Sequence, residues 1–421
     1  MAPQTSSSSS YLTKVISQDV HEKEFDGFPK MTSSSLKKLF NKNLSGSGWG
    51  KEHLLRLRTY IQDSSGLTQL KDSDVPKAIR DFINLKDEDI RCMDERKLFD
   101  KYKSESISTI ATLLGRLTAN ASAAGSSGAS GSAGAGGRYG LRPRDSNTGN
   151  APSDTESRSS GEYPSSMDTG ESQETGTSDG DFIEVQASAK RIPLERITVE
   201  LLSACMRLCL LYMPKQEGIS STLQWDSGEQ KFEAELGGLK YTSIDDGGLI
   251  IRQAGVTLEE ENWGDSRVLS VEAKRSATTS DGAGGLNMQD KWLAQIVSEA
   301  LAARKCSDPP TQVVNNQSLR VIAVSGTHAI FLEVEISQDY LTQLETALKS
   351  SIAKPPGFTK YLTVRKGKWM DLSTADGRRR LYRSLYDLWN EVLEEDSPED
   401  SEEDSDEDSD EDSDESDDSS E

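Results

Sequence analysis

The stretch Arg267 to Ser276, RVLSVEAKRS, decides how the C-terminal half of the chain is interpreted. Four apolar residues, two of them β-branched, predict a strand here, and Glu272 and Lys274 lie inside it two residues apart. Because alternate residues of a strand point to the same face, the carboxylate and ammonium groups are expected to emerge side by side.

The preceding stretch Ser243 to Gln253, SIDDGGLIIRQ, predicts a neighbouring strand that starts near Gly247, with Asp245 and Asp246 before it. If the two strands pair, one of these aspartates converges on the Glu/Lys pair. Two carboxylates bind a hard divalent cation through oxygen, and an ammonium beside them orients a water or steadies a phosphoryl oxygen. Together the two stretches outline a site for metal-assisted phosphodiester hydrolysis.

The Glu-x-Lys tripeptide alone is not specific, because it occurs at Glu95–Lys97, Glu229–Lys231 and Glu272–Lys274. Only the third copy lies in a predicted strand that follows an Asp-led strand. The competing interpretation is an ordinary surface ion pair, which stabilises a sheet by about 0.2 to 1 kcal/mol. The residues by themselves leave both interpretations open.

Composition limits how much of the chain can fold. Apolar residues make up 34% of the 421 residues, and the net charge is -23. A chain of this composition is expected to contain segments that cannot bury enough surface to form a core. Most of the negative charge lies in Glu394 to Glu421, which holds 19 acidic residues and no basic one. The remainder is nearly neutral, so net charge does not exclude a polyanionic partner for the folded part.

The four cysteines show no Cys-x-x-Cys spacing and the chain has three histidines, so we do not expect a zinc cluster. The N-terminus lacks the pattern of a secretory signal, and no apolar run is long enough for a membrane span. We therefore expect an intracellular protein without a membrane partner, in the nucleus rather than the cytoplasm.

The distribution of residue types predicts five regions. They are a disordered N-terminus at 1–32, a small helical module at 33–119, a linker at 120–186 that is rich in Gly, Ser and Ala and then acidic, a folded domain at 187–393, and a disordered acidic Ser/Asp/Glu tail at 394–421.

Hydrophobic periodicity predicts the elements of both folded regions. In the module we expect helices at 33–39, 51–62, 77–85 and 94–117. In the domain we expect helices at 197–213, 288–305, 341–351 and 378–393, and strands at 223–225, 231–236, 239–244, 247–253, 268–274, 319–324, 329–336 and 361–364. This order predicts a mixed α/β fold (α+β) with one central mixed sheet flanked by helices.

The order of elements, with Asp before the second strand and Glu-x-Lys in the third, resembles the PD-(D/E)XK nuclease superfamily. Within it, the Gly-Leu-Ile-Ile run, the Gln-bearing helix that follows, and the late stretch WMDLSTADGRRRLYRSL are similar to uncharacterised fungal proteins with nuclease-like domains. The resemblance covers about Glu195 to Leu393. It implies a restriction-endonuclease-like core, and a nuclease that depends on Mg²⁺ or Mn²⁺ and acts on nucleic acid.

The resemblance also implies roles for individual residues. Asp246 and Glu272 would bind the metal together with the carbonyl of Ala273, and Lys274 would orient or activate the attacking water. Asp245 is an alternative to Asp246 as the metal-binding aspartate. Further candidates are Glu200 on the first helix, and Gln289 and Gln295 on the helix after the motif. The sequence departs from the common pattern because no Pro precedes the Asp, and the Gln-x-x-x-Tyr pattern of the exonuclease branch is missing.

Basic residues near the motif could contact a phosphate backbone. The candidates are Lys240, Arg252 and Arg275. A second group, Arg378, Arg379, Arg380 and Arg383, is more typical of the solvated start of a helix.

The acidic tail supports a different class of function. Its repeated Ser/Asp/Glu blocks repel one another and suit an acidophilic kinase. The alternative is therefore a non-catalytic nuclear adaptor that binds histones or other basic proteins through the tail, and whose nuclease-like fold has lost activity.

Overall fold

The computed structural model describes residues 11–14, 19–20, 23, 37–39, 45–64, 74–92, 94–126, 194–214, 221–253, 266–274, 278–280, 286–306, 318–349 and 359–396. Residues 1–123 and 192–421 form one compact unit, and 124–191 are assigned to another. The predictions for most of the N-terminus, the linker and the acidic tail, and the role of Arg275, fall outside the described residues.

The helices follow in chain order. They are α1 (Tyr11–Lys14), the 3-10 helix η1 (Gly46–Gly48), α4 (Lys51–Arg56), α5 (Lys77–Ile83), α6 (Asp87–Cys92), α7 (Glu95–Tyr102), α8 (Glu105–Ser126), α9 (Leu194–Leu211), α10 (Asp290–Lys305), α11 (Gln338–Lys349) and α12 (Ala375–Asp396).

The strands form one large sheet and two hairpins. They are β1 (Thr59–Asp63), β2 (Ser221–Asp226), β3 (Lys231–Leu236), β4 (Leu239–Ile244), β5 (Gly248–Gln253), β6 (Ser266–Ala273), β7 (Thr278–Ser280), β8 (Leu286–Met288), β9 (Ser318–Ser325), β10 (His328–Glu335), β11 (Leu362–Lys366) and β12 (Met370–Asp371).

The central sheet has eight strands in the order β1-β11-β10-β9-β6-β5-β2, and β12 pairs with β10. The pairs β1·β11 and β6·β9 are parallel, and the other pairs of the sheet are antiparallel. The hairpins β3-β4 and β7-β8 lie outside this sheet. The expected mixed α/β fold with one central mixed sheet flanked by helices is confirmed.

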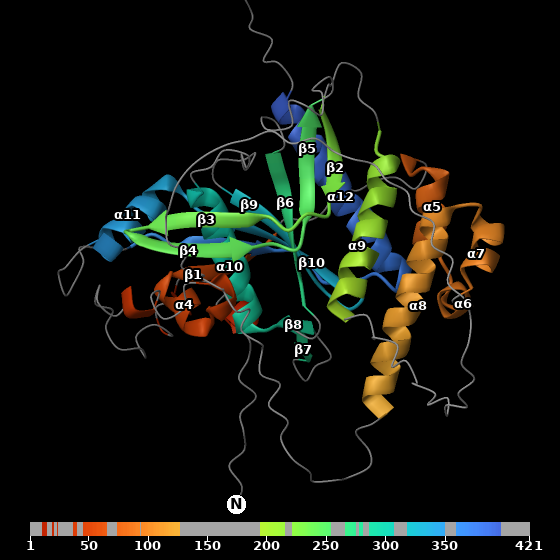
Figure 1. Ribbon diagram of the computed structural model, residues 1–421, viewed down its shortest axis with the longest axis horizontal. Coiled ribbons are helices and arrows are strands. Elements are labelled where there is room, and N and C mark those ends of the chain that lie inside the picture. The colour runs from red at the N-terminus through yellow and green to blue at the C-terminus, as the bar shows by residue number, and fades with distance from the viewer. Residues whose placement is uncertain are drawn as a thin grey trace, which may run out of the picture. The chain divides into compact units, whose positions relative to one another are not determined.

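The sheet is covered on both faces (Figure 1). One apolar cluster joins one face of the sheet to α9, α12 and the helices α5 to α8, and a second joins the other face to α4, α10, α11 and the hairpin β3-β4. Neighbouring residues of β9 show the division, because Ile322 and Val324 belong to the first cluster and Val321 and Ala323 to the second. Strands buried on both faces carry continuous apolar runs, as β9 does at 321–324.

The first strand of the sheet comes from the predicted helical module. We expected a helix over 51–62, but α4 ends at Arg56 and β1 pairs with β11, with Thr59 opposite Leu362. The apolar positions of this stretch fit one helix face, yet Ile61 is fully buried as a strand residue. The predicted helical module and the predicted domain thus share one sheet and one compact unit.

The predicted helix at 94–117 is two helices. Lys103 adopts a left-handed conformation (φ 53°) between α7 and α8. Helix α8 then continues to Ser126, into the start of the predicted linker, and α12 ends at Asp396, in the start of the predicted tail.

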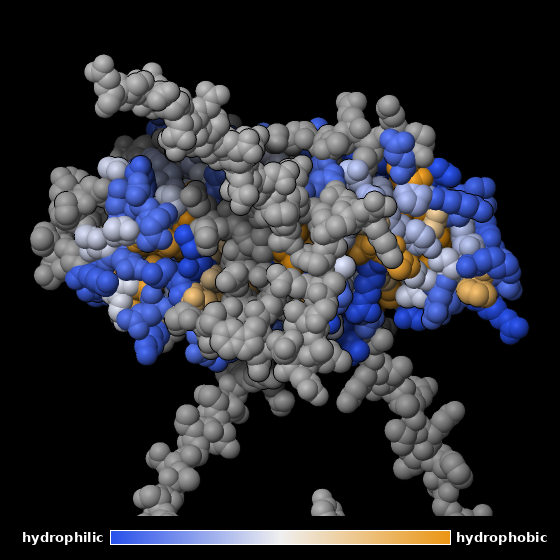
Figure 2. All heavy atoms as spheres, turned by 90° about the horizontal axis from the view of Figure 1, so that it is seen from above, coloured by the Kyte–Doolittle hydropathy of each residue, from blue (hydrophilic) through white to orange (hydrophobic). Residues whose placement is uncertain are grey.

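Most of the coloured surface in Figure 2 is hydrophilic, and hydrophobic residues show in small areas between the polar ones. Within the described part of the chain, no helix combines the length and apolar character needed to cross a membrane.

Candidate functional site

The predicted pairing of the two motif strands is confirmed, and it sets the position of Asp246. Strands β5 and β6 are antiparallel, with Gly248 opposite Ser270. Asp246 lies just before β5, and its backbone N–H donates to the Val271 carbonyl at 2.9 Å. Its carboxylate accepts a hydrogen bond from the Ala273 backbone N–H at 2.7 Å. Asp246 is therefore held against the end of β6, beside the Glu-x-Lys motif.

This close approach requires glycine. A Cβ on Gly248 would lie 2.0 Å from the Leu269 carbonyl oxygen, and Gly247 has a φ of +118°. A larger residue at Gly248 would push β5 away from β6, whereas one at Gly247 would be strained by the positive φ and would meet the Asp226 carbonyl oxygen at the end of β2. The Gly-Gly pair of the motif thus fixes the distance between the two acidic residues.

Glu272 and Lys274 form an ion pair, as expected from their spacing in a strand. The Glu272 side chain is 1% exposed and that of Lys274 is 31% exposed, so the ammonium reaches the surface while the carboxylate does not. Lys274 also lies 3.7 Å from a carboxylate oxygen of Glu195 on α9. A lysine between two carboxylates is held charged and in a fixed direction.

Helix α10 contributes two further polar residues. The Gln295 amide donates to Glu272 Oε1 at 2.6 Å and to Glu299 Oε1 at 3.1 Å. Glu299 is fully buried. Gln295, a candidate from the sequence, therefore orients Glu272, whereas Glu299 was not predicted. The only signal for Glu299 was a carboxylate four residues after Gln295 in the mostly apolar middle of this helix.

Burial dominates the electrostatics of these acids. It raises the pKa of Glu272 to about 7, with Lys274 opposing the rise and Asp246 adding to it. Burial also raises the pKa of Asp246, against the Ala273 N–H and Lys274. The pKa of Glu299 is raised well above its usual value by burial and then by Glu272. Burial opposes the charge of Lys274, but the nearby carboxylates, Glu272 foremost, raise its pKa overall.

Asp245, the competitor of Asp246, has a different environment. Its side chain is fully buried, accepts hydrogen bonds from the backbone N–H groups of Gln230 and Gly247, and lies 3.5 Å from Arg267. Burial raises its pKa to about 6, and Arg267 opposes that rise. Asp245 thus ties the turn before β5 to the sheet, and Asp246 is the aspartate beside the Glu/Lys pair.

Arg267 was not singled out from the sequence. Its guanidinium is buried and also lies 3.2 Å from Asp226, 3.0 Å from Gln230 Oε1 and 3.3 Å from the Gly228 carbonyl. It joins the end of β2 to β6. A charged residue in an apolar strand was the available signal, but its partners lie about 40 residues earlier in the chain and no local pattern indicates them.

The remaining candidates lie elsewhere. Glu200 is on α9 but pairs with Arg196 at 3.0 Å, and the acid of this helix that reaches Lys274 is Glu195. Gln289 precedes α10 as its N-cap residue and makes no side-chain capping bond. Lys240 is exposed on β4 opposite Glu235. Arg252 is near the far end of β5, about 20 Å along the extended chain from Asp246.

We expected the arginines at the start of α12 to be exposed to solvent, but one of them is buried. Arg378 is 1% exposed, and its guanidinium donates to backbone carbonyls. The acceptors are Phe82, Ile83, Leu85, Leu372 and Ser373. Arg378 therefore joins α12 to the end of α5 and to Leu85 just after it.

The donors at this site suit a hard cation. The carboxyl groups of Asp246, Glu272 and Glu195 interact with one lysine, Lys274. Asp246 and Glu299 each interact electrostatically with Glu272. A divalent cation would relieve this excess of negative charge, and carboxylate and carbonyl oxygens are its preferred ligands. Among the described residues, no group of three or more His, Cys, Asp and Glu side chains is arranged to hold a metal ion. The donor set would be two carboxylates, from Asp246 and Glu272, and the Ala273 carbonyl.

No family model matches this chain, and no curated protein matches it significantly.

Proposed function

We propose that this chain hydrolyses phosphodiester bonds of nucleic acid in a metal-dependent reaction, in a core of the restriction-endonuclease type. The order of elements supports the proposal. Helix α9, the strands β2, β5 and β6, helix α10 and strand β9 follow one another, and only the hairpin β3-β4 and the short β7-β8 interrupt them. The first three strands are antiparallel neighbours and β9 is parallel to β6.

One observation carries the proposal. The Asp246 carboxylate accepts a hydrogen bond from the Ala273 N–H, the peptide group between Glu272 and Ala273. This bond brings an acid just before β5 and an acid of β6 together beside the ammonium of Lys274. An ordinary surface ion pair does not explain why Glu272 is buried and faces a second acid, because burying a charge beside a like charge costs free energy.

Each residue then has a role. Asp246, Glu272 and the Ala273 carbonyl hold Mg²⁺ or Mn²⁺, which when bound supplies a water of lowered pKa and neutralises charge on the phosphate. Gln295 fixes the direction of the Glu272 carboxylate. Lys274, held by Glu272 and Glu195, orients the water and stabilises negative charge that develops on the phosphoryl oxygens.

The test is a cleavage assay with purified full-length protein, on plasmid DNA and on single-stranded DNA and RNA, with Mg²⁺ or Mn²⁺. We expect Asp246→Asn, Glu272→Gln and Lys274→Ala each to reduce the cleavage rate by about a hundredfold or more. The pattern of cleaved substrates identifies the nucleic acid.

Two control variants match the changes in charge. Glu235→Gln removes an exposed carboxylate of β3, and Lys97→Ala removes the exposed lysine of another Glu-x-Lys tripeptide. Both should cleave at the wild-type rate. If the wild type cleaves no substrate, or if the three site variants cleave as fast as it does, the proposal is wrong.

A further inference from the structure

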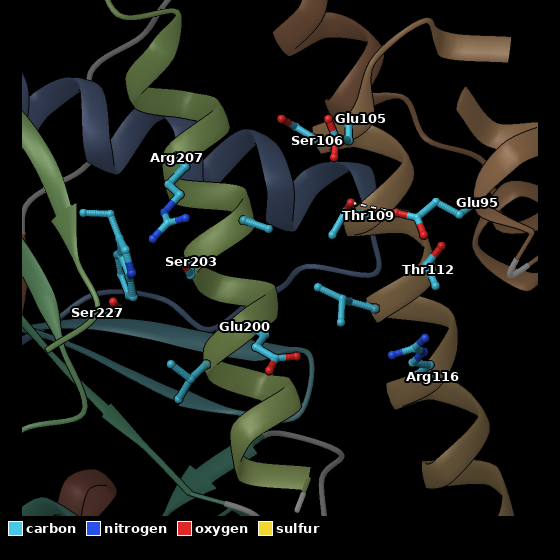
Figure 3. A pocket seen from close by; sticks show the side chains of 14 residues that line it. Glu95, Glu105, Ser106, Thr109, Thr112, Arg116, Glu200, Ser203, Arg207 and Ser227 are labelled. Carbon is cyan, nitrogen blue, oxygen red and sulfur yellow. Dashed lines mark hydrogen bonds between the residues drawn. The ribbon is translucent and has the colours of Figure 1, made fainter. Parts of the chain in front are cut away.

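Polar side chains outside the acidic site gather at a cavity and at the end of the central sheet where β6 and β9 finish. The cavity has a volume of about 620 Å³ and lies between α8, α9 and the end of β2 (Figure 3). Its arginines, Arg116 and Arg207, come from different helices and lie apart, and the Glu95 carboxylate already accepts a hydrogen bond from Thr109 at 3.0 Å. These groups do not converge on one ligand. The residues at the end of the sheet do.

Neighbouring strands bring a row of polar residues to this end of the sheet. The Lys274 backbone N–H donates to the Val324 carbonyl of β9 at 2.9 Å, so Lys274 lies beside the next residue of β9, Ser325. Ser325 is paired with His328 across the hairpin of β9 and β10, and His328 is paired with Asp371 of β12. Because paired residues of neighbouring strands point to the same face, these side chains form one row on one face of the sheet.

Helix α10 packs against that face. Trp369, two residues before Asp371, lies against Trp292 of α10, with 6.4 Å between the ring centroids. One turn later on the same helix, Gln295 binds Glu272. The row therefore continues the proposed metal site across the sheet, on the face where Glu272 lies.

The Asp371 carboxylate is held in one direction. Its Oδ1 accepts hydrogen bonds from the Thr327 hydroxyl at 2.9 Å, from the Ser373 backbone N–H at 2.9 Å and from the Ser373 hydroxyl at 2.7 Å. Its Oδ2 lies 3.8 Å from Nε2 of His328, and Nδ1 of that ring lies 3.5 Å from the Thr327 hydroxyl oxygen. The side chains of Asp371 and His328 are 32% and 33% exposed, so the pair reaches the surface of the protein.

The gap between Asp371 Oδ2 and His328 Nε2 fits one hydroxyl group. At 3.8 Å the two atoms are too far apart for a direct hydrogen bond, yet a single oxygen atom can lie about 2.8 Å from each. Such an oxygen donates to the carboxylate, and it accepts from the imidazole when the ring carries its proton on Nε2. A hydroxyl group does both, whereas a phosphate oxygen has no hydrogen and is repelled by the carboxylate. The pair therefore favours a hydroxyl over a phosphate.

The position of the pair connects this hydroxyl to the proposed substrate. His328 is two strands away from Lys274, or about 10 Å at the usual spacing of strands. Nucleotides follow one another at about 3.4 Å along a stacked strand, so a strand with a phosphate at Lys274 brings a sugar to His328 within about three nucleotides. The 2′-hydroxyl of ribose is the sugar hydroxyl that RNA has along its chain and DNA lacks.

We propose that His328 and Asp371 bind a ribose 2′-hydroxyl of the substrate strand, so that the site prefers RNA to DNA. The proposal rests on the phosphodiester site proposed above, whose substrate class it names. The two residues determine specificity, and no bond of the substrate is broken at them.

The experiment measures binding of three strands to the full chain by fluorescence anisotropy. The probes are ten-residue oligouridylates with ribose, 2′-deoxyribose or 2′-fluoro sugars, each with a 5′-fluorescein and a 3′-phosphate so that no terminal hydroxyl competes. Titrations run in EDTA, which prevents a metal-dependent reaction, and in Ca²⁺, which binds carboxylate oxygens, and gel electrophoresis confirms that the probes stay intact. The ribose strand should bind about tenfold more tightly than the other two, because a 2′-fluorine cannot donate to Asp371.

Two variants should remove the preference for ribose. His328→Ala loses the donor to the hydroxyl, and Asp371→Asn loses the acceptor but keeps an oxygen for Thr327 and Ser373. Both should bind the ribose and deoxyribose strands within about twofold of each other. His328→Gln, which retains an N–H donor, should keep part of the preference. Thermal unfolding checks that each variant is folded, and the others decide if one is not.

Asp339→Asn is the matched control for Asp371→Asn. Asp339 is 76% exposed and lies on α11, beyond the opposite end of β10 from His328. This variant should keep the preference for ribose. Lys274→Ala should also keep it, even where it binds both strands more weakly, because Lys274 is assigned to the phosphate and not to the sugar.

Sugar preference and cleavage test separate claims. A wild type that prefers the ribose strand but cleaves no substrate contradicts the proposed nuclease activity and supports the sugar contact. The sugar contact is overturned if no strand binds in either condition, or if the wild type binds the ribose and deoxyribose strands equally. It is also overturned if the 2′-fluoro strand binds as tightly as the ribose strand, or if His328→Ala and Asp371→Asn keep the preference.

Discussion

Glu272 is a buried carboxyl group with one cation and two other acids as its neighbours. Lys274 and Gln295 bind it, Glu299 hydrogen-bonds to it, and Asp246 raises its free energy when it is ionised. Without a bound cation, such a group destabilises the fold at neutral pH. This cost is what we expect of the proposed metal site, and an exposed ion pair that only stabilises a sheet would not carry it.

The free-energy cost of ionising the buried Glu272 predicts that the stability of the metal-free protein depends on pH. The pKa of Glu272 rises from 4.5 to about 7 in the folded chain. An acid with a higher pKa when folded binds more protons in the folded state, so the free energy of unfolding falls as the pH rises between these two values. We expect this contribution to fall by up to about 3 kcal/mol.

Urea unfolding of the wild type and of Glu272→Gln, from pH 4.5 to 8 in EDTA, measures this contribution. The neutral amide cannot ionise, so the variant should become more stable relative to the wild type as the pH rises. Glu235→Gln, at an exposed position, shows how the pH profile of the free energy of unfolding changes when an exposed carboxylate is removed. Parallel pH profiles for the wild type and Glu272→Gln would contradict the account.

Arg267 supports the site through Asp245. Arg267→Met should reduce the free energy of unfolding by about 3 to 5 kcal/mol, because it leaves the fully buried Asp245 carboxylate without its cation. The double variant Arg267→Met/Asp245→Asn should recover part of that loss. Arg196→Met, which breaks an exposed pair on α9, should change stability by less than about 1 kcal/mol. Equal losses from Arg267→Met and Arg196→Met in urea unfolding would rule out this role.

At the residue level, the sequence predicted which side chains share a strand but not which ones pack against them. The two-residue spacing of Glu272 and Lys274 and the Asp before β5 followed from local periodicity. Glu195, Glu299 and Arg267 were missed because their contacts depend on how α9, α10 and β2 pack against β6. The choice between Asp245 and Asp246 also needed the structure, because adjacent residues point in opposite directions.

At the level of elements, the β5-β6 pair determines the geometry of the site. Gly248→Ala would place a methyl group 2.0 Å from the Leu269 carbonyl oxygen, so β5 must move away from β6. We expect a loss of about 2 kcal/mol or more in the free energy of unfolding, and a loss of activity that exceeds what unfolding explains. Urea unfolding and the cleavage assay measure the two effects.

Gly50→Ala is the matched control for this change. A Cβ at Gly50 meets nothing within 4 Å, and its φ is not in the left-handed region. It should leave cleavage unchanged. Wild-type stability and activity in Gly248→Ala would show that the close approach of the two strands does not matter.

Elements with strong periodic patterns were predicted well, and those that depend on distant partners were not. Helix α10 and the strands β9 and β10 lie within two residues of their predicted bounds. The strand β1 was predicted as the second half of a helix, because Leu54, Leu55, Leu57 and Ile61 fit one helical face. Pairing with β11, some 300 residues later, decides the outcome, and local sequence contains no information about it.

At the level of the whole molecule, the N-terminal part is integral to the fold. Strand β1 extends the central sheet, and Arg378 of α12 donates to backbone carbonyls at the end of α5 and just after it. A fragment of residues 187–396, which contains the predicted domain (187–393) and the whole of α12, should therefore unfold at much lower urea concentration than the full chain or fail to fold. Circular dichroism during urea unfolding measures this difference.

A second deletion is the control for the truncation. Residues 124–191 are assigned to a separate unit, so replacing 127–191 with a Gly/Ser linker of about 30 residues should preserve the unfolding midpoint. If the 187–396 fragment is as stable as the full chain, the N-terminal part is a separate module as the sequence first indicated.

The central claim is that Asp246 and Glu272 bind a divalent cation beside Lys274. Anomalous diffraction from crystals of the protein grown with Mn²⁺ tests it most directly, because the scattering identifies the ion and its ligands. We predict an anomalous peak within ligand distance of both carboxylates, which is lost in Glu272→Gln. Crystals with Mn²⁺ bound elsewhere, or with no peak between the two carboxylates at saturating Mn²⁺, would contradict the account.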